Sequence, residues 1–387
     1  MNLNERVAAI APSATLAISS KARAMAAEGK SVYSFGAGEP DFDTPAHIKE
    51  AAVRALSDGE TKYAPVTGLP RLREAICRKL DADNGLSFET DEVLVSDGAK
   101  HSLFNIFMAL CNEGDEVIVP APYWLSYPEM ISVAGARPVF VECSRDNEFK
   151  MTPAQFEEAL TAKTRAVILN SPSNPIGVMY DAAEIEALVE VAVRREVMIV
   201  SDEIYEKLIY EGAEHISPGS LSDEARALTV TVNGFSKSYA MTGWRLGYFA
   251  GPRELVKAAT ALQSHSTSGA NTFAQYGALA ALEGPQDCIG EMLSAFAERR
   301  TRMVEGLAAI PGVTCVKPMG AFYVLPRVAD FGLDSVTFAS RLLEREGVAV
   351  VPGAPFGADE HIRLSYACGM DTIEQGLAGL RRFVESL

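Results

Sequence analysis

The sequence predicts an α/β fold, with a large domain built on a mixed, mainly parallel sheet and a smaller α+β domain. Three observations support this prediction. The chain has 387 residues, 48% of them hydrophobic, so it can bury a large core. Short apolar runs alternate with longer amphipathic stretches through its middle. This alternation stops near residue 286, where a different pattern begins.

Short apolar runs predict the strands of the main sheet. Amphipathic stretches such as 99–112 and 181–195 lie between them, with apolar residues recurring three and four positions apart. Strands that are apolar on both faces and are joined by helices are typical of a parallel sheet covered on both sides. The runs are residues 92–96, 116–120, 138–142, 166–170, 197–201, 229–233 and 246–250.

Both ends of the chain lie outside this alternation. A charged amphipathic stretch over 286–310 predicts a long helix. A closing helix is expected from Asp371, after short strands near 313–316, 320–325 and 361–366. The N-terminal segment also lacks the strand–helix pattern, so we expect it to pack with the C-terminal part. We therefore predict a large domain over residues 45–285 and a small domain formed by residues 1–44 and 286–387.

Composition excludes several classes of function. Lys and Arg number 35 against 51 Asp and Glu, and the net charge of −16 disfavours a nucleic-acid partner. The 6 cysteines include no CxxC pair, and no two of the 5 histidines have metal-ligand spacing, so we expect neither a disulfide framework nor a metal. No apolar run is long enough for a membrane helix, and the N-terminus lacks the basic start of a signal peptide. We therefore expect a cytoplasmic protein.

The usual signatures of nucleotide and hydrolase sites are absent from the sequence. GAGEPD at 36–41 begins like a dinucleotide-binding loop but lacks the third glycine, and no phosphate loop, HExxH or GxSxG motif occurs. Polar segments instead follow three predicted strands, where ligands bind in open α/β sheets. These segments are SPSNPIG at 171–177, DEIY at 202–205 and GFSKSYAMTGWRLGY at 234–248.

The chemistry of these segments is mutually consistent. A lysine can form a Schiff base, an aspartate can hold a pyridine nitrogen protonated, and an arginine with backbone amides can bind a phosphate. Those are the requirements of pyridoxal phosphate, whose protonated ring accepts electrons. Lys237 lies in a turn rich in Ser and Tyr, eight residues before Arg245, which is an unusual setting for a solvated surface lysine.

These motifs resemble the fold-type I aminotransferases, which are pyridoxal phosphate enzymes. Within them, the sequence is similar to the class I group of bacterial aspartate aminotransferases that also contains aspartate/prephenate enzymes. The resemblance extends nearly from end to end, from SATLA at 13–17 to RLSYA at 363–367. It implies transfer of an amino group between an amino acid and a 2-oxo acid, by a homodimer with shared active sites.

The resemblance also implies roles for residues around the cofactor ring. Lys237 corresponds to the Schiff-base lysine that carries a proton between the substrate α-carbon and the cofactor C4′. Asp202 corresponds to the partner of the ring nitrogen, and Tyr205 with Asn174 to the polar groups at the ring oxygen. Trp124 corresponds to the aromatic residue that stacks on the ring and faces the substrate, as Asn174 also does.

At the cofactor phosphate, the resemblance implies Arg245 and the N-terminus of a helix formed by Gly98, Ala99 and Lys100. Tyr63 corresponds to a tyrosine that reaches the phosphate of the neighbouring subunit. One departure concerns Gly234, where many relatives have a serine that holds the phosphate. Ser236 is the candidate replacement.

For the substrate, the resemblance implies that Arg363 binds the α-carboxylate in a bidentate manner, beside a backbone contact from Gly38. A dicarboxylic substrate needs a second cation, for which Lys100 is the candidate, with Ser13 and Thr15 as hydroxyl partners. A lysine in the first turn of a helix is disfavoured by the helix dipole, so it suggests an anionic ligand there. Aspartate and glutamate, with oxaloacetate and 2-oxoglutarate, are therefore expected, and prephenate is a further candidate.

Alternatives remain open at this stage. Neutral or aromatic amino acids are the second choice of substrate, because a lysine on its flexible stem can swing aside. A pyridoxal phosphate β-lyase of the same fold is a further alternative, since it would share the residues that bind the cofactor. A non-catalytic regulator that kept only the cofactor pocket is another. Structural roles are also open, namely a core position for Trp124, a carboxylate partner for Arg363 and a helix cap for Asp202. The resemblance further implies a cis peptide bond before Pro175.

Overall fold

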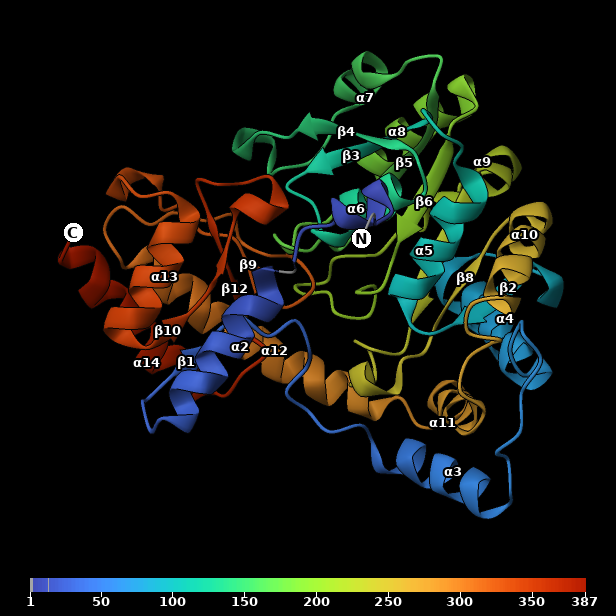
Figure 1. Ribbon diagram of the computed structural model, residues 1–387, viewed down its shortest axis with the longest axis horizontal. Helices are drawn as coiled ribbons and strands as arrows, with labels where there is room; N and C mark the ends of the chain where they lie inside the picture. The colour runs from blue at the N-terminus through green and yellow to red at the C-terminus, as the bar shows by residue number, and fades with distance from the viewer. Residues whose placement is uncertain (1–2, 13) are drawn as a thin grey trace.

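The computed structural model describes residues 3–12 and 14–387, and its main sheet is mixed and mainly parallel, as predicted (Figure 1). Strand β8 runs antiparallel to β2 and β7, whereas the other neighbouring strands pair in parallel. The order across the sheet is β2 (Val93–Ser96), β8 (Gly247–Ala250), β7 (Thr229–Gly234), β6 (Met198–Asp202), β5 (Thr164–Asn170), β3 (Glu116–Ala121) and β4 (Arg137–Glu142).

Helices cover both faces of this sheet because its strands are apolar on both sides. Along β3, Val117 and Val119 join the core on one face, whereas Ile118 joins the core on the other. Helices α5 (Ala99–Leu110), α6 (Ser126–Val133) and α10 (Arg253–Ser264) lie on the first face. The second face is covered by α7 (Pro153–Ala159), α8 (Ala182–Arg195) and α9 (Asp223–Leu228).

A further helical layer packs beside β2. Helix α3 (Ala46–Ser57) contacts α11 (Thr272–Glu283), which in turn contacts α4 (Pro70–Asn84). Helix α4 begins with proline at its first position and ends at Gly85, whose left-handed φ of 64° suits a glycine. This layer joins the start of the predicted large domain to its end, and α4 carries polar residues toward the sheet.

Segments near the two ends of the chain, α2 (Ala14–Ala27) with β1 (Tyr33–Ser34) and the part from α12 (Asp287–Ala308) onward, lie side by side (Figure 1). Phe35 shares a core with the C-terminal part and with residues 204–210. Strands β1 and β10 (Val348–Ala349) pair in parallel and so tie the N-terminal segment to the C-terminal part. The antiparallel strands β9 (Tyr323–Val324), β12 (Ile362–Ser365) and β11 (Val351–Pro352) form a small sheet. The helices here are α2, α12, α13 (Ser335–Glu346) and α14 (Met370–Glu385), while α1 (Glu5–Ala8) contacts α6.

Two local expectations were wrong. Residues 313–316 form a single bridge between Thr314 and Arg327 instead of a strand, because the chain leaves the small sheet after one pair. The cis peptide bonds among the described residues precede Pro122 and Pro172, not Pro175. The bond before Pro175 lies inside a tight turn that the Gly177 N–H closes on the Ser173 carbonyl at 2.9 Å, and the ordinary trans form fits this turn.

The register of the main sheet brings the predicted motifs to one edge. Gly247 lies opposite both Ser96 and Gly234, and Asn170 lies opposite Asp202. All of these positions are at the carboxyl ends of parallel strands or at the start of β8, where loops converge in an open α/β sheet. Among the residues that the structure describes, no helix is both long and apolar enough to cross a membrane.

Candidate active site

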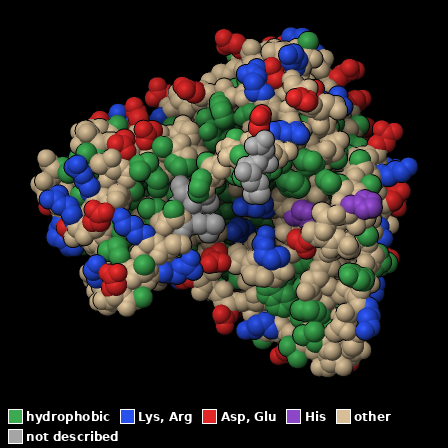
Figure 2. All heavy atoms as spheres, in the orientation of Figure 1, with side chains coloured by type: hydrophobic (Ala, Val, Ile, Leu, Met, Phe, Trp, Pro, Cys, Tyr) green, Lys and Arg blue, Asp and Glu red, His purple; other side chains and the backbone are tan. Residues whose placement is uncertain are grey.

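A cavity of about 400 Å³ lies at this edge, between the main sheet and the C-terminal core. Figure 2 shows Lys and Arg side chains gathered in a hollow near the centre of the molecule. The cavity brings together most of the predicted residues, although they come from distant parts of the sequence. Its walls include Gly38, Ala99, Lys100, Trp124, Asn174, Asp202, Tyr205, Ser236, Lys237, Arg245 and Arg363.

Lys237 lies in the turn after β7, at the wall of the cavity. Its ammonium group donates a hydrogen bond to the Gly38 carbonyl, and no carboxylate of the described residues pairs with it. Burial lowers the pKa of Lys237 to about 8, although Glu39 opposes this shift. An amine with such a pKa is partly neutral near pH 8 and can act as a nucleophile toward a carbonyl group.

Asp202 ends β6, and its carboxylate is almost completely buried. It accepts a hydrogen bond of 2.6 Å from the Tyr127 hydroxyl and one of 3.4 Å from the Ile204 N–H. Burial raises the pKa of Asp202 to about 6, and the neighbouring Glu203 adds to the rise. Among the described residues no cationic side chain forms an ion pair with this carboxylate, although the Lys237 charge acts on it, so the site is suited to a cationic ligand.

Tyr205 reaches the same cavity from the turn after β6. Its hydroxyl lies 2.9 Å from the hydroxyl of Tyr323, a buried residue of β9. Burial and Tyr323 raise the pKa of Tyr205 well above its ordinary value, so Tyr205 is a neutral hydroxyl that can donate. The two tyrosines therefore connect the main sheet to the small sheet across the cavity.

Arg363 enters the cavity from β12 and is only 2% exposed. Its guanidinium donates to the Asn174 side-chain oxygen and to the Gly36 carbonyl, each at 3.1 Å, and lies 4.5 Å from the ring centroid of Tyr323. No carboxylate among the described residues pairs with it, and its Nε has no acceptor. Because a buried, uncompensated guanidinium is costly, this position suits an anionic ligand.

Asn174 is held by a short chain of hydrogen bonds from the sheet. Its N–H donates to the Asn170 side chain at 2.9 Å, and Asn170 in turn donates to the Asp202 backbone carbonyl at 2.9 Å. These bonds fix the 171–177 segment to the ends of β5 and β6. The Asn174 side chain can therefore present its amide to the cavity while its oxygen accepts from Arg363.

The opposite end of the cavity is formed by the start of α5 and by Arg245. Gly98 has a φ of 88°, and a Cβ there would lie 2.4 Å from an Arg245 nitrogen, so a larger residue would be strained and would displace the Arg245 side chain. Arg245 donates to the Thr242 carbonyl at 2.9 Å. The backbone N–H groups of Ala99 and Lys100 have no acceptor among the described residues. Two free amides at a helix N-terminus beside an arginine form an anion-binding site.

Lys100 and Trp124 line the cavity, and Lys100 is exposed to solvent. The Lys100 ammonium is 4.9 Å from the Trp124 ring centroid, and Trp124 meets Tyr127 edge to face at 5.2 Å. Burial and the nearby cation of Arg245 lower the pKa of Lys100. Trp124 is only partly buried and lines the cavity, so it is more than a core residue.

Some predicted residues lie elsewhere. Tyr63 is 92% exposed and does not reach the cavity of its own chain. Ser13, and the side chain of Thr15, lie outside the described residues. Gly234 packs against β8, where a Cβ would lie 3.0 Å from the Gly247 Cα, so a serine does not fit there without a shift. Ser236 lines the cavity instead.

The residues present fit pyridoxal phosphate. The buried carboxylate of Asp202 suits a protonated ring nitrogen, and the lysine with the lowered pKa suits a Schiff base. The free amides at the start of α5, with Arg245 beside them, suit a phosphate. Asn174 and Tyr205 offer hydrogen bonds between these two ends. Among the described residues, neither Asp202 nor Arg245 has an ion-pair partner, and the amides of Ala99 and Lys100 have no acceptor, so these groups are available to hold it.

Sequence reasoning missed several residues of the cavity, in particular Tyr127, Tyr323, Asn170 and Glu39. Tyr127 follows Trp124 by three positions, which places both on one face of the turn into α6, so helical spacing was a usable signal. Asn170 is the last residue of a predicted strand, and this position in the sequence could also have indicated that it lines the cavity. Tyr323 comes from a separate part of the chain, and nothing in its local sequence indicates that it faces the cavity.

Comparisons with known proteins agree with this geometry. Residues 30–380 match the family model described as aminotransferase class I and II. The chain is 51% identical to the aspartate aminotransferase of Geobacillus stearothermophilus, covering 100% of both, and 46% identical to the aspartate/prephenate aminotransferase of Cereibacter sphaeroides, covering 100% of this chain and 99% of that protein. The aspartate aminotransferase of Thermus thermophilus with maleate superposes with a TM-score of 0.95 at 46% identity, covering 99% of each chain. The chain therefore belongs to the class I and II aminotransferases, a family of pyridoxal phosphate enzymes.

Proposed function

We propose that this aminotransferase moves the amino group of aspartate or glutamate to a 2-oxo acid, with oxaloacetate and 2-oxoglutarate as the matching acceptors. One observation carries the proposal, namely that a lysine with a lowered pKa, a buried carboxylate and a buried unpaired arginine line a single cavity. The full-length relatives named aspartate and aspartate/prephenate aminotransferase support the same substrate class.

Each residue has a role that follows from its position. Arg363 binds the substrate α-carboxylate with its guanidinium, whose place is fixed by Asn174. Lys237 takes the α-proton and returns it on the cofactor side, which its pKa of about 8 allows near neutral pH. Asp202 holds a proton on the ring nitrogen, and Tyr205 donates to the ring oxygen. The bound cofactor supplies an electron sink for the substrate carbanion.

We assign the phosphate to Arg245 and the start of α5, with Gly98 allowing the close approach and Ser236 supplying a hydroxyl in place of a serine at 234. Trp124 supplies a flat aromatic face for the ring. This arrangement leaves the exposed Lys100 side chain as the cation for a distal carboxylate. The Thermus relative was solved with maleate, a dicarboxylate, which supports a second anion site of this kind.

The proposal extends to prephenate, because its side-chain carboxylate presents the same charge to Lys100. The relative from Cereibacter sphaeroides is named for both substrates. Thr15 and Ser13 remain proposed hydroxyl partners. A preference for neutral or aromatic amino acids is the competing possibility, since an exposed lysine can move away when the substrate has no distal charge.

A half-reaction rate series tests the substrate assignment. Aspartate, glutamate, alanine, phenylalanine and arogenate are mixed with the wild type and with Lys100→Ala, and loss of the visible cofactor band is followed. The variant should lose one or two powers of ten in rate for the acidic donors alone, because a charge-assisted bond of about 1.5–3 kcal/mol is lost. Lys163→Ala, at an exposed lysine remote from the cavity, is the matched control. Equal losses for alanine and aspartate would place Lys100 at the phosphate and remove the basis for the substrate choice.

We also propose that the domains divide as residues 45–285 against 1–44 and 286–387, and that a cytoplasmic homodimer is the active unit. Tyr63, exposed on one chain, is then available to the phosphate of the partner's site. The free state of all described cysteines is compatible with a reducing compartment. Sedimentation of the enzyme during turnover tests the dimer, and a monomer with full activity would refute the shared site.

A further inference from the structure

A buried group of charged side chains lies behind the turn that follows β6. Asp202 and Tyr205 line the cavity, whereas Glu203 and Glu206 point away from it toward α4. The turn is fixed by hydrogen bonds from the Glu203 N–H to the Val232 carbonyl at 2.9 Å and from the Glu206 N–H to the Glu203 carbonyl at 3.0 Å. One short segment therefore presents two residues to the cofactor site and two carboxylates to a separate network.

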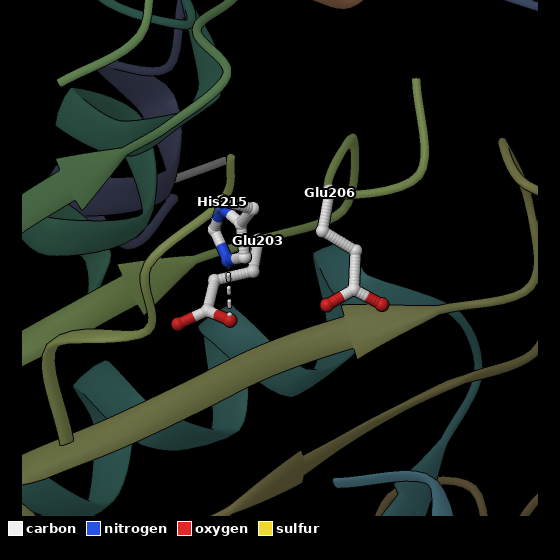
Figure 3. A group of neighbouring side chains, drawn as sticks. All are labelled: Glu203, Glu206 and His215. Atoms are coloured by element: carbon white, nitrogen blue, oxygen red, sulfur yellow. Dashed lines mark hydrogen bonds and ion pairs between the residues drawn. The ribbon is translucent and has the colours of Figure 1, made fainter. Parts of the chain in front are cut away.

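Glu203 is 1% exposed and is surrounded by donors. Its carboxylate accepts from the Ser201 hydroxyl at 2.8 Å and from the Ser217 hydroxyl at 2.6 Å. The ring Nε2 of His215 lies 2.9 Å from the same carboxylate (Figure 3). An ionised carboxylate only accepts hydrogen bonds, so this set of donors fits a negatively charged Glu203.

Glu206 is paired with the Lys79 ammonium of α4 and accepts from the Asn84 side chain at 2.7 Å. Asn84 also donates to Glu203 at 3.2 Å, so it connects the two carboxylates. Lys79 supplies one positive charge for two buried negative charges. Asp83 lies 3.8 Å from the Lys79 ammonium and 2.9 Å from that of Lys207, so Lys207 supplies the cation for Asp83.

The missing positive charge has one candidate in this network. Side chains of Glu203, Glu206 and His215 resemble a metal-ligand set, but the Lys79 ammonium already lies where a cation would be needed beside Glu206. His215 faces Glu203, and its side chain is 9% exposed, so solvent does little to screen the pair. An imidazole that is protonated on both nitrogens would make the network neutral.

We propose that His215 is a positioning residue whose positive charge compensates Glu203, so that Asp202 keeps its negative charge for the cofactor's ring nitrogen. This inference rests on the proposed function. Glu203 is adjacent to Asp202 in the chain, and its charge raises the pKa of the Asp202 carboxyl. An uncompensated charge on Glu203 would therefore favour the proton on Asp202 over the ring nitrogen and weaken the ion pair.

The pKa of His215 agrees with its position beside the Glu203 carboxylate. Burial lowers the pKa of His215, but the carboxylates of Glu203 and Glu206 outweigh burial and the opposing Lys79, so the pKa lies above its ordinary value. Glu203 also raises the pKa of Asp202, which is the effect that His215 limits.

A charge-rescue cycle tests the proposal. Dissociation constants of pyridoxal phosphate are measured with the cofactor-free forms of the wild type, His215→Gln, Glu203→Gln and the double variant, at one pH near 7.5. Gln keeps a neutral donor near Glu203. His215→Gln should weaken binding by about one power of ten, the order expected for one unit charge that acts through a medium of effective dielectric about 20. The double variant restores neutrality and should recover most of the loss.

The outcomes are distinct. Unchanged binding in His215→Gln, or a double variant that binds no more tightly than His215→Gln, would overturn the proposal, because a merely structural role predicts no rescue. If His215→Gln does not fold, the imidazole titration of His215 in the wild type is followed by NMR, with the resonance assigned by its absence from the double variant. A protonated ring through pH 7 supports the proposal, and a neutral ring at pH 7 overturns it. A wild type that fails to bind the cofactor would refute the proposed function instead.

Discussion

Asp202→Asn should stabilise the cofactor-free enzyme while weakening its hold on the cofactor. Burial raises the pKa of Asp202 from 3.8 to about 6, so the folded protein binds this proton more tightly than the unfolded chain does. Stability is therefore lost as pH rises from about 4 to about 6, and a shift of this size corresponds to about 3 kcal/mol. The asparagine cannot ionise and escapes this loss, and the Tyr127 hydroxyl can still donate to its oxygen.

Urea unfolding of both cofactor-free proteins, at one protein concentration between pH 4 and pH 7.5, measures the effect. The free-energy advantage of the variant should grow by about 2–3 kcal/mol over this range, because part of the full effect is already present at pH 4. Burying the asparagine amide has a cost that does not depend on pH, so it does not affect how the stability difference between the two proteins changes with pH. The affinity of the variant for the cofactor should fall by two or three powers of ten, because a buried ion pair with the ring nitrogen is lost. A stability difference that does not depend on pH would refute the assignment of a raised pKa to Asp202.

Three further variants probe the cavity. Tyr323→Phe removes the hydroxyl 2.9 Å from that of Tyr205 and should shift the pH dependence of the cofactor spectrum, with less than about tenfold loss of turnover. Gly98→Ala should displace Arg245 and weaken binding of the cofactor at its phosphate, while free pyridoxal binds as before. Arg363→Lys should raise the KM for every amino acid by about ten- to a hundredfold, since the bidentate contact is lost, and an effect on aspartate alone would contradict its role.

The sequence was sufficient to predict the main sheet, because its strands are apolar on both faces and apolar residues recur at helical spacing in the segments between them. Each apolar run became a strand within about two residues of the predicted bounds, and 286–310 became α12 (Asp287–Ala308). The strand expected at 313–316 does not form, because only Thr314 pairs with a neighbouring residue. Such short pairings leave no alternation of apolar and polar residues from which a strand can be predicted. Likewise, β1 and β10 could not be predicted from the sequence, because a strand of two residues shows no periodicity.

The cavity was predictable where a motif follows a strand, as for Asp202, Lys237 and Asn174. Tyr323 was not, because its place depends on how β9 packs against the main sheet. Tyr63 illustrates another limit, since one chain shows only that it is exposed, and its proposed role needs a second chain. The spacing of the histidines indicates no role for His215, because its contact with Glu203 forms only when the turn after β6 is folded.

The most direct test of the central claim is the half-reaction with aspartate alone. Purified enzyme carrying pyridoxal phosphate is mixed with aspartate in the absence of any 2-oxo acid, and the visible absorption and the products are followed together. The visible band should disappear as the amino form of the cofactor accumulates, with one oxaloacetate released per site, and Lys237→Ala should do neither. Release of ammonia without that conversion, or an active Lys237→Ala protein, would contradict the assignment of this chain as an aspartate-type aminotransferase acting through Lys237.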